Sequence, residues 1–211
     1  MDANANLREY LGARELTGRY SSFDYCFNHF QGFRSDGRLD ELAGADTLQL
    51  SCLHLGFYLA SWGMLRGSST LLQRSVRHFV PVVEVIAGSE PEVWEIDAHR
   101  YGDDEWALLR RTGGQIRAAL PEGASDILVT KILLGVFGSV PAFDTYFKKG
   151  FGASTYGHRA LRRVETFYRE NEEVVEGHRV ATLDFQSGEP SQFVYSRAKV
   201  IDMIFFVEGA P

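Results

Sequence analysis

Residues 48–65 read LQLSCLHLGFYLASWGML, eighteen consecutive residues without a formal charge. This length is at the lower limit of what can span a bilayer. Polar side chains interrupt the run at Gln49, Ser51, His54 and Ser61, and the chain has no second segment of this kind. We therefore expect a buried core helix here and no association with a membrane.

Small residues follow one side of this expected helix. Their spacing is four, three and four residues, at Gly56, Ala60, Gly63 and Gly67. A glycine inside a helix costs about 1 kcal/mol relative to alanine, so the close approach of another backbone is a reason to keep it. The spacing predicts that a helix over residues 125–137 covers this stripe.

The remaining sequence predicts further helices around this centre. Apolar residues at three- and four-residue steps, bounded by capping and turn residues, indicate helices over 23–34, 103–120, 125–137, 161–175 and 197–207. Residues 80–87 fit a short strand or a helix turn equally well, whereas the SGEP sequence at 187–190 predicts a hairpin. We predict an all-α fold, a single globular helical domain over 1–211, with at most one small β-hairpin at about 180–195. The polar residues 1–20 are expected to be loosely ordered.

Composition limits the functional classes. The chain has 211 residues, and its 22 Lys and Arg against 28 Asp and Glu give a net charge of −6, which argues against broad binding to nucleic acid or anionic lipid. Two cysteines, Cys26 and Cys52, are too few for a disulfide framework, and residues 1–6 resemble no secretory signal. We expect a cytoplasmic protein.

Two segments depart from the acidic average. Residues 47–83 and 145–164 contain no Asp or Glu. If they meet in the fold, they would form a basic face; if they do not, they are ordinary solvated helix faces. The candidate nucleic-acid-binding residues in them are Arg66, Lys148, Lys149, His158, Arg159, Arg162 and Arg163.

The stretch most suggestive of chemistry is SDILVTKILLGVFGSVPAFDTYF at 125–147. Asp144 follows a glycine–proline break and is expected at a helix N-terminus, with Lys131 on the preceding helix folding back to face it. Such a pair can act as nucleophile and acid/base partner, so Asp144 and Lys131 are the candidate catalytic residues. The alternative is an ion pair in which Asp144 is simply an N-cap.

The order of lysine-bearing helix, proline and aspartate resembles the core of the helix-hairpin-helix DNA glycosylase superfamily. FDTYF at 143–147 takes the place of that family's VDTHV-like motif, and KVIDM at 199–203 is similar to the closing helix of some members. The resemblance covers residues 120–203 and implies that Asp144 is a catalytic carboxylate acting on a base in DNA.

Three features depart from that family's pattern. LPEGA at 120–124 replaces Leu-Pro-Gly-Val-Gly, Lys131 lies too far beyond Pro121 to match the nucleophilic lysine, and the iron–sulfur cysteines of some members are absent. These departures favour a relative that keeps the helical scaffold without the chemistry.

Metal and cofactor sites are not predicted. Cys26 and His29 would share a helix face, but Cys52 and His54 are two residues apart and point to opposite sides of a helix, so the four cannot converge on zinc. The chain has no G-x-S-x-G, G-x-x-x-x-G-K-[ST] or G-x-G-x-x-G motif.

Three hypotheses about function remain. The first is a nucleic-acid-associated protein. The second is a non-catalytic interaction or scaffold protein, whose protein partner would bind over residues 23–33 or at Phe205 and Phe206. The third is an aromatic small-molecule pocket in which Arg66 or Lys131 holds an anion, enclosed by Tyr58, Trp62, Trp94 and Trp106.

Overall fold

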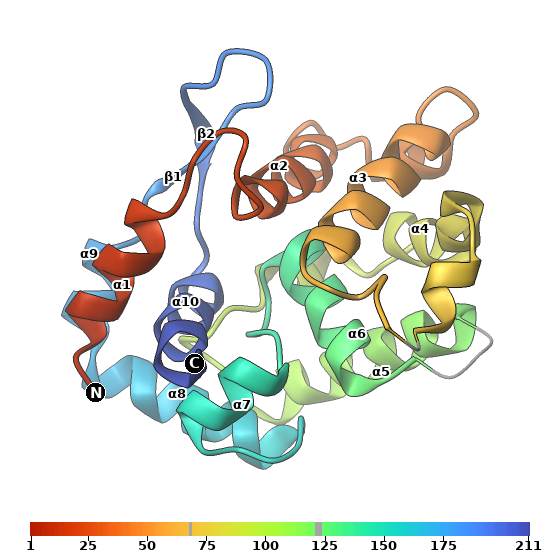
Figure 1. Cartoon of the computed structure of the whole chain (residues 1–211). Coiled ribbons are helices and arrows are strands. Elements are labelled where there is room, and N and C mark those ends of the chain that lie inside the picture. Colours follow the sequence, from red (N-terminus) through yellow and green to blue (C-terminus); the bar gives the residue numbers. More distant parts are fainter. Residues whose placement is uncertain (68, 121–123) are drawn as a thin grey trace.

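The computed structural model describes residues 1–67, 69–120 and 124–211. These residues form ten α-helices and a single two-stranded antiparallel sheet (Figure 1), which confirms the all-α prediction with one small hairpin. The first helices are α1 (Ala3–Gly12), α2 (Ser21–Ser35), α3 (Leu48–Ser61), α4 (Val80–Ala87) and α5 (Asp103–Ala119). They are followed by α6 (Asp126–Ile132), α7 (Thr145–Phe151), α8 (His158–Glu170), α9 (Glu172–Gly177), β1 (Ala181–Leu183), β2 (Pro190–Val194) and α10 (Arg197–Gly209).

Short helical turns connect several of these elements. The 3₁₀ turns are η1 (Leu39–Ala43), η2 (Thr70–Gln73), η3 (Val76–Phe79) and η4 (Pro91–Glu95), and η5 (Leu133–Phe137) is a π-helical turn that continues α6. Within the described residues, no helix has the length and apolar character needed to cross a membrane. Residues 121–123, within the LPEGA stretch that departs from the glycosylase pattern, lie outside the described residues.

Helix α3 occupies the expected place but ends earlier than predicted. Its last residue is Ser61, and Gly63 turns the chain with a φ of 78°, a left-handed conformation that favours glycine. A Cβ added to Gly56 would contact Val76 and Phe79 of η3. The predicted stripe is therefore wrong, because its C-terminal glycines serve a turn and η3 covers Gly56.

The close contact between α3 and the α6–η5 segment is made instead by Tyr58 and Gly135. The Tyr58 hydroxyl donates a hydrogen bond to the carbonyl oxygen of Lys131 at 3.1 Å. A Cβ added to Gly135 would lie 2.8 Å from Cζ of the Tyr58 ring. The small residue that permits this crossing is thus on η5, whereas the sequence pattern placed it on α3.

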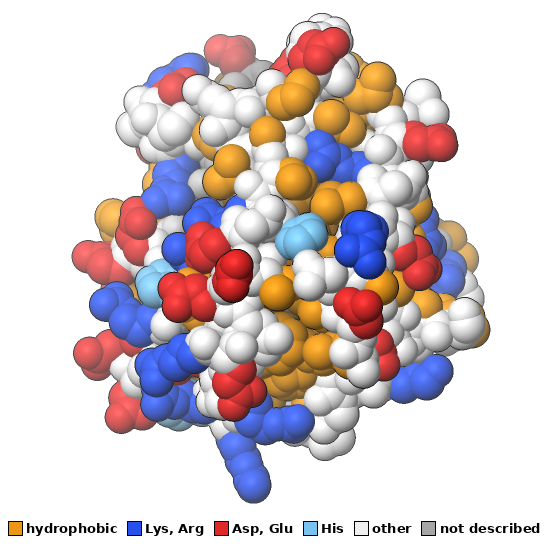
Figure 2. Space-filling model, turned by 90° about the vertical axis from the view of Figure 1, so that its left-hand side faces the viewer, with side chains coloured by type: hydrophobic (Ala, Val, Ile, Leu, Met, Phe, Trp, Pro, Cys, Tyr) orange, Lys and Arg blue, Asp and Glu red, His pale blue; other side chains and the backbone are white. Residues whose placement is uncertain are grey.

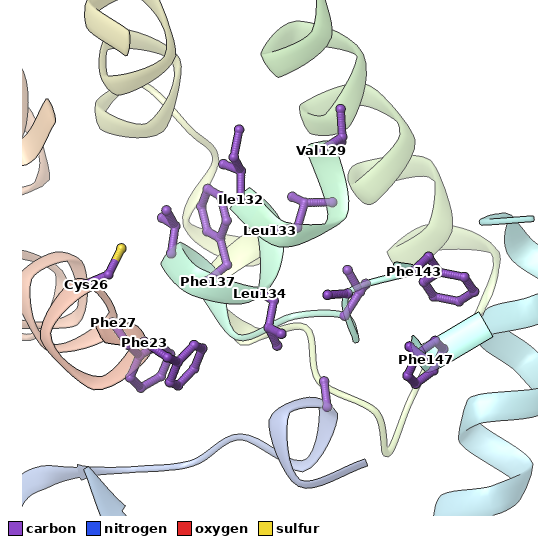
Figure 3. Close-up of a cluster of buried hydrophobic side chains, with 14 of the residues drawn as sticks. Phe23, Cys26, Phe27, Val129, Ile132, Leu133, Leu134, Phe137, Phe143 and Phe147 are labelled. Carbon is purple, nitrogen blue, oxygen red and sulfur yellow. The ribbon is translucent and has the colours of Figure 1, made fainter. Parts of the chain in front are cut away.

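The α6–η5 segment forms the centre of the molecule. Ser125 caps α6 as predicted, accepting a hydrogen bond from the backbone N–H of Leu128, and Gly138 ends η5 with a φ of 69°. Residues 128–143 are all buried. Figure 3 shows that the side chains of this segment point to several sides. Phe23 and Phe27 of α2 lie on one of those sides and belong to the same buried cluster.

Helix α10 is the second buried helix and lies between α1 and α7 (Figure 1). It crosses α7 at a pair of glycines: a Cβ on Gly150 would collide with the carbonyl oxygen of Phe205, and one on Gly209 with that of Tyr146. Residues 3–12 form α1, whose Leu7 is fully buried. The expectation of loose order is wrong there, because this helix covers α10.

Candidate functional site

Lys131 and Asp144 meet in the structure as predicted. Lys131 lies in the last turn of α6, and its Nζ is 2.8 Å from Oδ2 of Asp144. The other oxygen, Oδ1, accepts hydrogen bonds from the backbone N–H groups of Tyr146 and Phe147 at 3.0 Å, so Asp144 is also the N-cap of α7. The two side chains are 4% and 15% exposed. The pair therefore fastens the start of α7 to α6 inside the protein.

A second lysine–aspartate pair lies deeper, on α10. Lys199 Nζ is 3.3 Å from Asp202 Oδ2 and donates to the hydroxyl of Tyr10 at 2.9 Å, while Asp202 Oδ1 accepts from the backbone N–H of Ala142. Burial lowers the pKa of Lys199 and raises the pKa of Asp202, because removal from water disfavours the charged forms. From the sequence, Lys199 and Asp202 were linked only to the closing helix of some DNA glycosylases, through the KVIDM stretch at 199–203. Two charges three residues apart in an apolar helix were the available signal.

Trp62 connects the two pairs. The Nζ atoms of Lys131 and Lys199 lie 5.5 and 5.2 Å from its ring centroid, within the range of a cation–π interaction. Its own Nε1 is buried and has no hydrogen-bond partner among the described residues. We call Lys131, Asp144, Lys199, Asp202 and Trp62 the two-lysine cluster.

A third buried carboxylate, Asp24, serves the hairpin. It accepts hydrogen bonds from the Tyr195 hydroxyl at 2.7 Å and the backbone N–H of Leu183 at 2.9 Å, and Arg14 lies 3.2 Å away. Burial raises the pKa of Asp24, against the opposing effect of Arg14. These contacts fix β1 and the end of β2 on helix α2.

The geometry of the two-lysine cluster favours a structural role. A nucleophile or proton donor must touch its substrate, whereas Lys131 is almost fully enclosed and Lys199 is 1% exposed. Each aspartate is already engaged by a lysine and by backbone amides. The cluster can hold charge in place and orient α6, α7 and α10 relative to one another.

Three of the candidate basic residues bind within the protein. Arg162 lies 2.9 Å from Glu165, Arg163 donates to the backbone carbonyls of residues 151 and 152, and the ring of His158 stacks on Trp106. Among the described residues, Lys148, Lys149 and Arg159 have no acidic partner within ion-pair distance, and they lie on the consecutive helices α7 and α8. Arg66 belongs to the turn after α3, where its guanidinium packs on Gly63.

Basic and acidic side chains are mixed over the face that Figure 2 shows, without a large region of either charge. Residues 152–163, at the start of α8, form a hollow of about 430 Å³ that Arg159 and Arg163 line together with Ser154 and Thr155. Among the described residues, no Asp or Glu lines it.

The other predicted sites do not assemble. Phe23, Phe30, Phe205 and Phe206 are buried, so these four side chains fill the core and do not present a partner surface. The tryptophans of the predicted aromatic pocket pack in three different places, Trp62 on Tyr20, Trp94 on Phe137 and Trp106 on His158.

The four potential zinc ligands do not come together as one group in the described part of the chain. The rings of His29 and His54 stack with centroids 4.4 Å apart, and both Cys26 and Cys52 are free and buried. Over residues 1–67, 69–120 and 124–211, no group of three or more His, Cys, Asp and Glu side chains could hold a metal ion.

An apolar groove lies between α2, α3 and the hairpin tip, and sequence reasoning missed it. Its volume is about 750 Å³, and none of the described Lys, Arg, Asp or Glu residues lines it. Phe57 on α3 and Phe185 on the hairpin are 69% and 67% exposed, and they are joined by Leu16, Leu50 and Leu53. The spacing of Leu50, Leu53 and Phe57 was a visible signal, but we interpreted α3 as buried on all sides.

Comparison with known proteins finds no matching family model, no matching curated protein and no matching solved structure.

Proposed function

We propose that this protein is a non-catalytic interaction module that binds an amphipathic helix of a partner protein in the apolar groove. The observation that carries the proposal is the set of large apolar side chains left exposed around one hollow, at Leu16, Leu50, Leu53, Phe57 and Phe185. Contiguous exposed apolar surface of this kind marks interaction sites, because leaving it in water is unfavourable.

The shape of the groove suits a helical occupant. Its α3 wall presents Leu50, Leu53 and Phe57 along one helix face. A partner helix with apolar residues at positions i, i+3, i+4 and i+7 would pack its face against this wall and the exposed Phe185.

The charges next to the groove define the partner further. Four acidic residues are close in the chain to groove residues: Glu15 beside Leu16, Asp184 beside Phe185, Glu189 in the hairpin turn, and Asp46 one turn before Leu50. Among the described residues, none of the four forms an ion pair, and the nearby Arg19 lies over the Tyr20 and Trp62 rings. An acidic surround favours Lys or Arg flanking the partner's apolar face, and it disfavours a second copy of this chain.

A binding titration tests the proposal. A labelled synthetic helix with Leu at i, i+3, i+4 and i+7 and flanking Lys should bind in fluorescence anisotropy, and more tightly than the same helix with flanking Glu. Phe57→Gln should weaken binding by roughly tenfold or more, the size of a lost buried aromatic contact. Leu72→Gln, at an exposed leucine of η2, should leave it unchanged.

The proposal is wrong if the Lys-flanked helix does not bind, or if Phe57→Gln binds it as well as the parent protein. It is also wrong if light scattering shows a dimer that Phe57→Gln converts to a monomer, because a second copy would then occupy the groove.

Association with nucleic acid is the second candidate. It is favoured by the hollow that residues 152–163 form at the start of α8, where Arg159 and Arg163 line it and none of the described acidic residues does. Anisotropy with single-stranded and duplex DNA should then show binding that weakens steeply with salt, and exchanging Lys148, Lys149 and Arg159 for Glu should abolish it. Absence of binding at low salt excludes this candidate.

A further inference from the structure

Three arginines converge on a hollow of about 380 Å³ on another part of the molecule. Arg34 reaches it from α2, Arg179 from the segment after α9, and Arg197 from the start of α10. Its apolar wall contains Phe27, Trp94 and Phe137, and the Trp94 and Phe137 rings lie 4.4 Å apart. We call this the arginine pocket; it shares no lining residue with the apolar groove.

Arg179 and Arg197 are held in place but keep unused hydrogen-bond donors. Arg179 donates from Nε to the carbonyl of Tyr195 and from Nη1 to Glu176, and Arg197 donates from Nε to the same Glu176 and from Nη1 to Asp97. A guanidinium has five N–H donors. No hydrogen bond joins Nη2 of either arginine to another described residue, and both side chains are only about one quarter exposed.

The acidic residues in the pocket do not block an anion. Asp97 accepts hydrogen bonds from the backbone N–H groups of Ala98, Arg197 and Ala198, so its charge is already compensated. Glu95 pairs with Arg34, but its side chain is 72% exposed. Surface pairs of this kind contribute little free energy, so an incoming anion can replace Glu95 at Arg34.

From this arrangement we infer that the arginine pocket binds a small organic anion, a carboxylate or phosphate monoester attached to a flat apolar ring. The anionic group accepts hydrogen bonds from Arg179 and Arg197, because guanidinium groups match carboxylate and phosphate geometry. The ring lies against the wall formed by Phe27, Trp94 and Phe137, as aromatic groups favour stacked or edge contacts. The volume is within the range of small-molecule sites.

Isothermal titration calorimetry tests the inference with adenosine monophosphate and benzoate as the two anionic probes. Adenosine and benzamide are their neutral counterparts. At least one anion should bind, and its neutral counterpart should bind at least roughly tenfold more weakly, the effect of one lost charge-assisted hydrogen bond. Which anion binds identifies the phosphate or the carboxylate class.

Variants locate the site. Arg179→Gln should weaken binding by about tenfold. Gln192→Glu, at an exposed lining residue of β2 whose side chain has no hydrogen bond to another described residue, should weaken it by repulsion even if Arg179→Gln is unstable. Arg117→Gln is the matched control, because Arg117 likewise donates to a backbone carbonyl and to a carboxylate, at Ala124 and Asp126, but lies on α5, and it should have no effect. The inference is overturned if neither anion binds, if a neutral counterpart binds equally well, or if Gln192→Glu binds like the parent protein.

Discussion

Lys131 and Asp144 each satisfy several partners at once. The aspartate balances the charge of the lysine and accepts hydrogen bonds from two backbone N–H groups of α7. The lysine ammonium also lies over the ring of Trp62. Removing one member of a buried ion pair leaves the other charge without compensation, which costs far more than the pair contributes. The energetic importance of these residues thus follows from their environment, without any catalytic role.

A double-mutant cycle on this pair tests the structural role. Asp144→Ala should lower the free energy of unfolding by about 3–5 kcal/mol, because it strands the buried Lys131 ammonium. Lys131→Met should cost less, since Asp144 keeps its two amide hydrogen bonds, and the double variant should cost less than the sum. Urea denaturation measures all three. The exposed pair of Arg38 and Glu41 is the control, with Arg38→Ala expected to leave the unfolding curve close to that of the parent. Additive effects would mean that the buried charges do not interact.

Helices α7 and α10 pack more closely than side chains normally allow. Gly150 of α7 faces the backbone of Phe205, and Gly209 of α10 faces the backbone of Tyr146. A side chain can rotate away from an added methyl group, but a backbone carbonyl within a helix cannot. This contact requires glycine on both elements.

Gly150→Ala should therefore destabilise the protein by about 1–3 kcal/mol or more through overpacking. Gly114→Ala is the matched control, because Gly114 is within helix α5 and nothing lies within 4 Å of an added Cβ there. That control should be neutral or stabilising by up to about 1 kcal/mol, from helix propensity. Thermal unfolding followed by circular dichroism compares the two. Equal midpoints would show that α7 and α10 do not meet at these glycines.

Local sequence signals predicted where several helices begin. The contacts between elements that are far apart in the chain could not be predicted in this way. Ser125 and Asp144 cap the helices that their positions indicated, because a cap depends on residues two or three positions away. The glycine contacts of α7 with α10 depend on two helices far apart in the chain, and no local pattern specifies that meeting. The apolar groove was missed for a similar reason: Phe57 looks like a core residue until the position of the hairpin is known.

At the scale of the whole molecule, buried ionisable groups make stability depend on pH. The rings of His29 and His54 stack, and Ser51 bonds to His29 at 2.9 Å. Burial lowers the pKa of His29 to about 3 with a further contribution from His54, whose own pKa burial also lowers. Burial shifts the pKa values of Asp24 and Asp202 in the opposite direction, upwards, because it disfavours the charged carboxylate.

The sign of the histidine effect follows from these directions. Above about pH 6.5, His29 is neutral in both the folded and unfolded chain, so its stabilising contribution is fully present. As the pH falls below that value, the unfolded chain binds a proton that the folded protein excludes, and stability is lost progressively towards pH 3. The raised carboxyl pKa values of Asp24 and Asp202 act in the opposite direction, because the folded protein binds those protons more readily than the unfolded chain as the pH falls. The histidine contribution is therefore identified by comparing variants.

Unfolding in urea at about pH 7.5 and about pH 5.5 should show a loss of about 1 kcal/mol attributable to His29. His29→Gln should reduce this pH dependence, because glutamine cannot titrate. His99→Gln, at an exposed histidine, should retain it. If His29→Gln keeps the full difference, then the stacked histidines do not exclude the proton and the packing of α2 on α3 is looser than the structure indicates.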